Sequence, residues 1–443
     1  MANPPYKVSV LTNGLTVVTE ERHHAPVTSF WMGYRVGSRN ELPGQTGVSH
    51  WIEHMLFKPS QRFPGIERDR LIAREGGTTN AFTWIDCTAY YTTIPSSKLD
   101  IVLQIEADRL SGPLFAPDVF ETERSVILAE RDAYENQPEW RLAEQVTAAA
   151  FHAHPYGHEV IGIAEDIRNL SREDLLAYFR TYYIPNNAVC VVVGDFETRV
   201  LLGRLEELFS EIPPGATPPA PRAIEPAPVA ERRVLLEGPG ATGYLEMAFL
   251  APKATDPRFV PSLVLGSILG SPISLGFGSG AESRSSRLYR ALVEKELAID
   301  VDCNLEASID PFLFDITAVV RDGRTHGEVE GAILRELEAI AASPPDAAEM
   351  AKARKQLRAL FAFTNERITH RAMVLTLGFT VFPAQFLDEF EQRISDVTAE
   401  DVRAAAESLF ARRNRVVGWY QPLGGEDELE DADEETETEE GIQ

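Results

Sequence analysis

Apolar and polar residues alternate at the start of the chain in the way that strands require. The stretches KVSVLT and LTVVTE alternate on either side of Asn13-Gly14, a dipeptide that favours the tight turn of a β-hairpin. A third strand is predicted over 27–38. Residues 78–94 are rich in threonine and aromatic side chains, which predicts a pair of strands. The first part of the chain is therefore expected to build a sheet.

Apolar residues recur with helical spacing between these strands and after them. Helices are predicted over roughly 45–58, 98–111 and 117–136. Asp118 followed by Glu121 predicts a capping box at the start of the last helix. Because strands and helices are grouped and do not strictly alternate, the order favours an α+β fold over a doubly wound parallel sheet.

A proline-rich stretch divides the chain into halves of similar length. Residues 213–228, PPGATPPAPRAIEPAP, contain seven prolines and predict a stiff linker. In chain order, we expect an N-terminal domain over 1–212, a linker over 213–231, a C-terminal domain over 232–422 and a tail over 423–443.

The two halves resemble each other near their ends. Residues 167–195 can be laid on 394–422 without a gap, and each stretch has the pattern of a capped helix followed by a buried strand. The matched pairs include the N-cap residues Ser171 and Thr398, and also Asn187 and Asn414. A common helix–strand unit could give this similarity by chance, whereas the gapless register and the similar half lengths favour a duplicated domain.

The net charge narrows the range of partners. It is -26 for 443 residues, which argues against nucleic-acid binding because a phosphate backbone would be repelled. Residues 426–440 hold 11 acidic residues and no basic one, so we expect a disordered tail. The tail has two readings, solubility or the docking of a basic partner.

The cysteines and the apolar runs indicate a cytoplasmic protein. Cys87, Cys190 and Cys303 are far apart and odd in number, which suggests no disulfide framework and fits a reducing compartment. The first ten residues, MANPPYKVSV, lack the pattern of a signal peptide. No apolar run approaches the ~20 residues that span a membrane, so no membrane association is expected.

The stretch GVSHWIEHMLFK, residues 47–58, carries the candidate chemistry. His50 and His54 lie one helical turn apart on the same face, so both rings can bind one metal ion. Glu53 can reach a metal-bound water without being a ligand, and the order H-x-x-E-H is the inverted zincin signature. The alternative is a core helix whose histidines are satisfied by hydrogen bonds.

A catalytic zinc requires a third protein ligand, and Glu130 is the best candidate. Glu123 and Glu130 are seven residues apart and share a helix face with Val126 and Ile127, which is expected to point inward. A carboxylate on an inward face requires a partner, and zinc would supply one. Glu123 is either a residue that orients a histidine ring or a partly exposed helix glutamate.

The chain resembles the zinc metallopeptidase family of pitrilysin, insulysin and mitochondrial processing peptidase. The resemblance covers nearly the whole chain except the tail. It rests on the following stretches: HWIEH at 50–54, GGTTNAFTWIDCTAYY at 76–91, ETERSVILAERD at 121–132, HPYGHEVIGIAEDIRNLSREDLLAYFRTYYIPNNAVCVVVGDF at 154–196 and SSRLYRALVEKELAIDVDC at 285–303. It implies two duplicated domains, each a mostly antiparallel sheet packed with helices, that face each other as a clamshell.

The resemblance also implies roles for individual residues. His50, His54 and Glu130 match the family's zinc ligands, and Glu53 matches its general base. The expected reaction is zinc-dependent hydrolysis of peptides or extended protein segments. The expected substrate-binding edge strand, along which a peptide would pair, comprises Asn80, Ala81, Phe82 and Thr83. The alternative for these four residues is an ordinary paired strand.

One departure from the family concerns the second half of the chain. Single-chain relatives carry an Arg followed by a Tyr that help to hold the substrate carbonyl. The corresponding region offers Arg321 and Arg324 but no tyrosine, and no tyrosine occurs between Tyr289 and Tyr420. We therefore expect a homologous partner subunit, in a heterodimer or homodimer, that supplies the Arg–Tyr pair.

Two other functions remain open at this stage. One is a non-catalytic scaffold or assembly subunit of the same family. The other is a zinc hydrolase that acts on something other than peptides. Metal content and a peptide digest would separate these possibilities from the peptidase.

Overall fold

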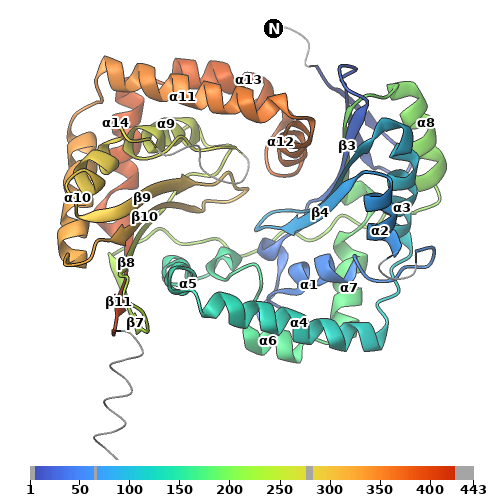
Figure 1. Cartoon of the computed structure of the whole chain (residues 1–443), viewed down its shortest axis with the longest axis horizontal. Coiled ribbons are helices and arrows are strands. Elements are labelled where there is room, and N and C mark those ends of the chain that lie inside the picture. The colour runs from blue at the N-terminus through green and yellow to red at the C-terminus, as the bar shows by residue number, and fades with distance from the viewer. Residues whose placement is uncertain (1–4, 64–66, 276–282, 425–443) are drawn as a thin grey trace, which may run out of the picture.

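The chain folds into two lobes that face each other (Figure 1). The computed structural model describes residues 5–63, 67–275 and 283–424. The predicted acidic tail, 426–440, lies outside the described residues. Each lobe has one sheet covered by helices, which confirms the α+β class and the clamshell arrangement.

The first lobe contains strands β1 to β6 and helices α1 to α8. Its strands are β1 Lys7–Val10, β2 Thr16–Glu21, β3 Val27–Tyr34, β4 Thr78–Thr83, β5 Thr88–Pro95 and β6 Ala188–Gly194. Its helices are α1 Val48–Met55, α2 Glu67–Arg74, α3 Leu99–Ser111, α4 Pro117–Glu135, α5 Pro138–Ala150, α6 Ala164–Asn169, α7 Arg172–Tyr182 and α8 Thr198–Phe209. The predicted hairpin is present, because β1 pairs with β2 in antiparallel register.

The second lobe repeats most of this order. Its strands are β7 Arg232–Gly238, β8 Tyr244–Leu250, β9 Ala298–Leu305, β10 Leu313–Val320 and β11 Arg415–Pro422. Its helices are α9 Phe259–Leu269, α10 His326–Ala342, α11 Ala347–Glu366, α12 Ile368–Thr380, α13 Ala384–Asp396 and α14 Ala399–Leu409. A π-helical turn covers Tyr289–Val293.

The sheet topologies confirm the duplication. The strand orders are β1-β2-β6-β3-β5-β4 and β7-β11-β8-β10-β9. In each sheet the last strand in sequence, β6 or β11, is inserted between a parallel neighbour and an antiparallel one. The two sheets therefore share one topology, with β1 as an additional edge strand in the first.

The matched segments also make the same local contacts. The side chains of Ser171 and Thr398 each cap a helix through a capping box. The Nδ2 of Asn187 donates to Tyr182 O at 2.8 Å, and the Nδ2 of Asn414 donates to Leu409 O at 2.8 Å. Each asparagine thus closes the end of its helix before the buried strand begins.

Several predicted boundaries are wrong in detail, each for a local reason. The capping box at Asp118 is absent, because Pro117 begins α4 and Ala116 is the N-cap residue. The first predicted helix begins only at Val48, since Gly47 has a φ of 85°, outside the helical region. The strand predicted over 27–38 ends at Tyr34, before a 3-10 turn.

The residues predicted to form the linker lie between the last helix of the first lobe and the first strand of the second. Residues 213–229 form neither helix nor strand. They connect α8 of the first lobe to β7 of the second. The placement of the domain limits at 212 and 232 stays a prediction.

The lobes are held together by a reciprocal exchange of helices. Helix α5 of the first lobe packs on β8 and β11, and α12 of the second lobe packs on β3 and β6. Glycine makes room at both contacts. A Cβ on Gly33 would lie 2.5 Å from Thr376 Cγ2, and one on Gly418 would lie 2.3 Å from Val146 Cγ2. These close approaches require the absence of a side chain.

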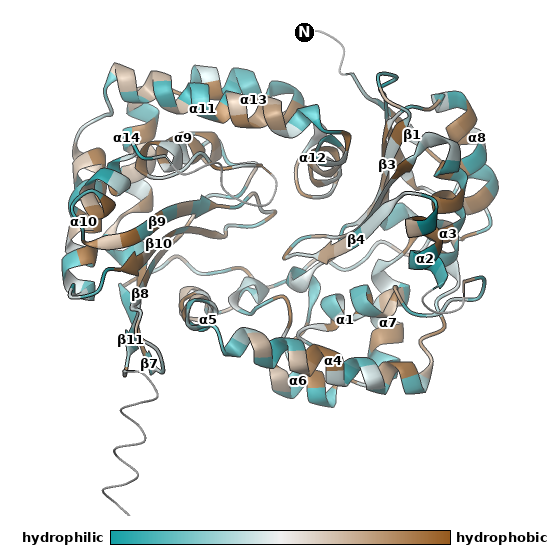
Figure 2. Ribbon diagram, viewed as in Figure 1, coloured by the Kyte–Doolittle hydropathy of each residue, from teal (hydrophilic) through white to brown (hydrophobic). Residues whose placement is uncertain are grey.

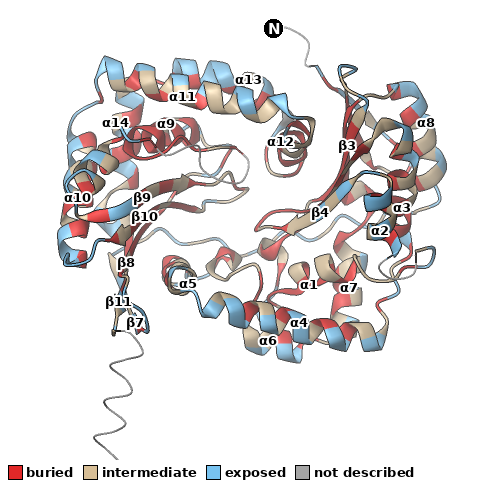
Figure 3. Cartoon of the chain, viewed as in Figure 1, coloured by how far each residue is buried: buried red, intermediate tan, exposed pale blue. Residues whose placement is uncertain are grey.

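The apolar core extends across this junction. Buried residues of β3 and β6 join one continuous cluster with those of α9, α12 and α14. Apolar residues gather where helices meet the sheets, and the outward helix faces are polar and exposed (Figures 2 and 3). A buried ion pair, Arg371 Nε to Glu20 Oε2 at 2.8 Å, fixes α12 to the edge of β2. No helix of the described residues is long and apolar enough to cross a membrane.

Candidate metal centre

Helix α1 is fixed at its N-terminus and along one buried face, which leaves the opposite face with its polar side chains uncovered by the core. The carboxylate of Glu41 accepts hydrogen bonds from the backbone N–H groups of Gly47 at 2.8 Å and Ser49 at 2.9 Å, which satisfies the helix N-terminus. Val48, Trp51 and Met55 are buried and anchor the helix in the core. The indole of Trp51 stacks on Phe120 of α4. The opposite face therefore presents His50, Glu53 and His54.

The structure brings His50, His54 and Glu130 together. Their ligand atoms all lie within 4.8 Å of one another. Glu130 Oε2 lies 3.5 Å from His54 Nε2 and 4.0 Å from His50 Nε2. Ligand atoms at ~2.0–2.1 Å from a tetrahedral zinc would lie about 3.4 Å apart, so these spacings fit a zinc ion with a modest contraction.

Glu123 lies behind this group and contacts a histidine. Its Oε1 is 2.9 Å from His54 Nδ1, and its Oε2 is 2.6 Å from Lys58 Nζ. The contact leaves His54 Nε2 free to face Glu130. The partly exposed alternative is wrong, because Glu123 is 3% exposed. The predicted inward face is correct for Glu123 and Ile127, whereas Val126 lies on its flank and is exposed.

The environment of His50 matches that of a neutral ligand. Burial and the nearby His54 lower the pKa of His50 to about 3, so the ring carries no proton charge at neutral pH. Its Nδ1 is buried and makes no hydrogen bond to the described residues. Metal ions bind the neutral imidazole, so burial prepares this ring for coordination.

Glu53 is placed beside the three candidate ligands and is not one of them. Its Oε2 accepts a hydrogen bond from Thr83 Oγ1 at 2.6 Å. Burial raises the pKa of Glu53, although the Thr83 bond opposes the rise. A carboxylate with a raised pKa is a better proton acceptor at neutral pH.

The four residues predicted to bind substrate lie in the edge strand β4. β4 is the last strand of its sheet, and no described strand pairs with its outer side. The Trp84 N–H donates a hydrogen bond to Cys87 O, and in an antiparallel pair every second residue turns its backbone N–H and C=O toward the partner strand. The backbone groups of Asn80 and Phe82 therefore face β5, and those of Ala81 and Thr83 face the outer edge. The side chain of Thr83 is buried and donates a hydrogen bond to Glu53, while its backbone groups remain on the outer edge of the strand.

The side chain of Asn80 already occupies one of the outward backbone groups of β4. Its Oδ1 accepts a hydrogen bond from the Ala81 N–H at 2.9 Å. A peptide that pairs with β4 would replace this bond and release the Asn80 side chain. Asn80 is exposed, and Phe82 and Ala81 are half-buried.

The two arginines considered in the second half are not directed at this centre. The second lobe contacts the first just after the end of β9, where Trp84 Nε1 donates a hydrogen bond to the carboxylate of Glu306. β10 runs back from that junction over eight residues, or ~26 Å, before it reaches Arg321. Arg321 lies 3.9 Å from Glu296, and Arg324 donates to the Glu296 carbonyl.

Sequence reasoning missed two residues that support the centre. Lys58 holds Glu123, and Tyr134 O–H lies 3.4 Å from Glu130 Oε1. Both stand four positions after a candidate ligand, Lys58 after His54 and Tyr134 after Glu130. This spacing was an available signal for Tyr134, which shares α4 with Glu130, whereas Lys58 lies beyond the end of α1.

Comparison with known proteins decides the family. Residues 16–163 match the family described as Insulinase (Peptidase family M16), and residues 169–357 match the one described as Peptidase M16 inactive domain. The chain belongs to peptidase family M16. Both domain types of the family are thus present in one short chain.

Similar proteins cover between two thirds of this M16 chain and nearly its whole length. The mitochondrial-processing peptidase subunit beta of Lentinula edodes is 27% identical over 432 residues, which cover 95% of this chain and 91% of the relative. The zinc protease PqqE of Helicobacter pylori is 28% identical over 298 residues, 66% of this chain and 65% of the relative. A crystal structure of a protease from Helicobacter pylori has a TM-score of 0.89 and 26% identity, and covers 95% of this chain and 100% of its own.

Proposed function

We propose that this M16 chain is a zinc-dependent endopeptidase that hydrolyses peptides or extended protein segments. The observation that carries the proposal is the convergence of His50, His54 and Glu130 on one point, with Glu53 beside it. The zinc protease name of the Helicobacter pylori relative supports the same activity. In this proposal the first three residues are zinc ligands and Glu53 is the general base.

The chain's own residues account for the proton transfers. When bound, zinc would supply Lewis-acid polarisation of the scissile carbonyl and activation of a water molecule. Glu53 takes the proton of the attacking water and passes it to the leaving nitrogen. The Thr83 hydroxyl holds one oxygen of Glu53, which orients the other toward the reacting atoms. Glu123 holds the His54 ring in a fixed orientation.

The substrate is proposed to bind as an added strand along β4. The outward backbone groups of Ala81 and Thr83 would pair with an extended peptide. The first lobe places this edge next to α1, so the paired peptide would pass the metal centre. Asn80, once released from the Ala81 N–H, would be free to hydrogen-bond the peptide near the cleaved bond.

Two variants test the metal and the base separately. We expect about one zinc per chain by elemental analysis, lost in His50→Ala and retained in Glu53→Gln. Glu53→Gln is expected to lower peptide hydrolysis by at least ~100-fold. Glu121→Gln, on the exposed face of α4, is the matched control and should change neither quantity. Hydrolysis that survives Glu53→Gln would refute the mechanism.

A homologous partner subunit is part of the proposal. Arg321 and Arg324 are turned to Glu296, and the relatives named as beta subunits support assembly with another chain. We expect the purified chain to cleave flexible peptides poorly and a co-purified partner to restore the rate. Cleavage by the chain alone at rates typical of peptidases would remove the need for a partner.

A non-catalytic scaffold subunit is the second candidate, favoured by the match of residues 169–357 to the inactive domain type. It predicts chains without bound zinc and no effect of Glu53→Gln on any activity of the assembly. The cytoplasmic location belongs to the proposal as well, and is checked by cell fractionation.

A further inference from the structure

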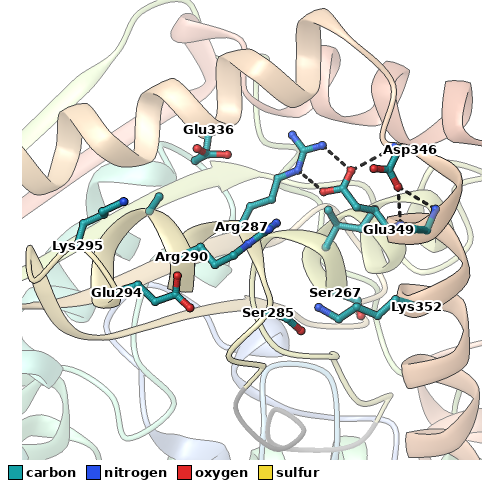
Figure 4. A pocket seen from close by; sticks show the side chains of 13 residues that line it. Ser267, Ser285, Arg287, Arg290, Glu294, Lys295, Glu336, Asp346, Glu349 and Lys352 are labelled. Atoms are coloured by element: carbon teal, nitrogen blue, oxygen red, sulfur yellow. Dashed lines mark hydrogen bonds and ion pairs between the residues drawn. The ribbon is translucent and has the colours of Figure 1, made fainter.

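A cavity lies in the second lobe, away from the metal centre. It has a volume of about 840 Å³ and is lined by α9, α10, α11 and the π-helical turn (Figure 4). Charged side chains of both signs surround it, and most of its lining carries a hydrogen-bonding group. Its size falls in the range of small-molecule sites.

Some of the charges in this cavity are already compensated. Arg287 forms a two-point pair with Glu349, with distances of 2.7 and 2.8 Å. Asp346 caps α11 and accepts hydrogen bonds from the backbone N–H groups of Ala348 and Glu349, each at 2.8 Å. Glu336 faces Arg287. These groups need no ligand to balance them.

Arg290 and Lys352, which line the same cavity, form no ion pair with any described residue. Arg290 makes only a weak contact, from Nε to the Ser286 carbonyl at 3.4 Å. Lys352 of α11 forms no ion pair within the described part of the chain, and burial together with the nearby Arg290 lowers its pKa, although the charge of Glu349 opposes this shift. Two like charges placed close together destabilise the fold unless an anion lies between them.

An unsatisfied hydroxyl lies at the same end of the cavity. Ser267 is 1% exposed, and its Oγ makes no hydrogen bond to any described residue. In Figure 4 the ends of Lys352, Ser267 and Ser285 point toward one another, and Arg290 reaches in from the π-helical turn. Buried polar atoms without a partner are rare, and π-helical turns occur frequently at functional sites.

We propose that this end of the cavity binds the phosphate group of a small molecule. A guanidinium, an ammonium and two hydroxyls approach from different directions, which suits a tetrahedral oxyanion carrying up to two negative charges. The cavity is much larger than a phosphate, so the remainder of the ligand would extend along it. At the opposite end the carboxylates of Glu294 and Glu336 outnumber the single cation Lys295, and this balance disfavours a second anionic group there. The ligand class is therefore a phosphomonoester.

Isothermal titration of the full chain with inorganic phosphate tests the proposal directly. At constant ionic strength set with sodium chloride, we expect one phosphate site per chain. Acetate should bind at least ~10-fold more weakly because it offers fewer acceptor oxygens and less charge, and pyrophosphate should gain nothing from its second group. Equal binding of acetate, or no phosphate site at all, would overturn the proposal.

Variants assign the site to these residues. Lys352→Met is expected to weaken phosphate binding about 10-fold, and Ser267→Ala should weaken it less. Lys355→Met is the matched control, because Lys355 lies on the same helix and lines a different cavity. If Lys352→Met fails to fold, Arg290→Gln on the exposed π-helical turn takes its place. Equal phosphate affinity in the control and in these variants would refute the assignment.

Discussion

Glu159 is a carboxylate whose ionisation should destabilise the folded chain. Burial raises its pKa from 4.5 to about 7, and repulsion from Glu144 adds to the rise, while Arg131 offsets part of it. No described residue donates a hydrogen bond to its carboxylate. Glu159 also raises the pKa of Glu246, a buried carboxyl on β8. Replacing Glu159 by glutamine keeps its shape and removes the charge.

The pKa of Glu159 in the unfolded chain, 4.5, and in the folded chain, about 7, set the size and sign of its effect on stability. Between pH 4.5 and 7 the folded chain binds more protons at this position than the unfolded chain does, so stability falls as the pH rises through that interval. The rise of about 2.5 pKa units corresponds to ~3.4 kcal/mol above pH 7. Because Glu159 is half-buried, solvent screening reduces this to about 1–3 kcal/mol.

Thermal unfolding at two pH values measures this difference. An unfolding entropy of ~2.1 cal/mol/K per residue gives about 0.9 kcal/mol/K for 443 residues, so Glu159→Gln should raise the Tm by roughly 1–3 °C at pH 8.5. At pH 5 the wild-type carboxyl is protonated and the two proteins should melt together. Glu165→Gln, at an exposed carboxylate of α6, serves as the control. A variant that is less stable at pH 8.5, or equally shifted at both pH values, would contradict the reasoning.

Three further outcomes are expected. Gly33→Ala should destabilise the chain by about 1–3 kcal/mol in denaturant unfolding, because the added methyl group meets α12. Lys58→Met leaves Glu123 without its cation and should weaken zinc binding about 10-fold in a chelator competition. Thr83→Val should lower kcat for peptide hydrolysis by about 10-fold with zinc content unchanged, since Glu53 loses its orienting hydrogen bond.

The sequence predicted best what is encoded over one or two helical turns. The spacing of His50, Glu53 and His54 placed three side chains on one face of a helix, and the structure has that helix. The capped helix and buried strand at Ser171 and Thr398 were visible because each depends on contacts within a few residues. The β1–β2 hairpin was predicted correctly for the same reason, because its turn and its paired strands lie within a few residues of one another.

What the sequence could not reveal arises from contacts between distant segments. Lys58 and Glu123 meet across 65 positions, and Thr83 reaches Glu53 across 30, so no local spacing reveals either contact. The N-cap of α4 was assigned wrongly to Asp118 for the opposite reason. There a single proline outweighed a capping pattern that was otherwise well formed.

The exchange of helices connects the metal centre to the second lobe. Glu130 lies on α4, which ends at Glu135, and α5 begins at Pro138 and packs on the sheet of the second lobe. The two residues between these helices leave little freedom, so a shift of the second lobe would be transmitted through α5 to the position of Glu130. The histidines on α1 are fixed within the first lobe instead. The geometry among the three candidate ligands thus depends on how the two lobes pack, which gives the lobe without a metal motif a physical influence on the metal centre.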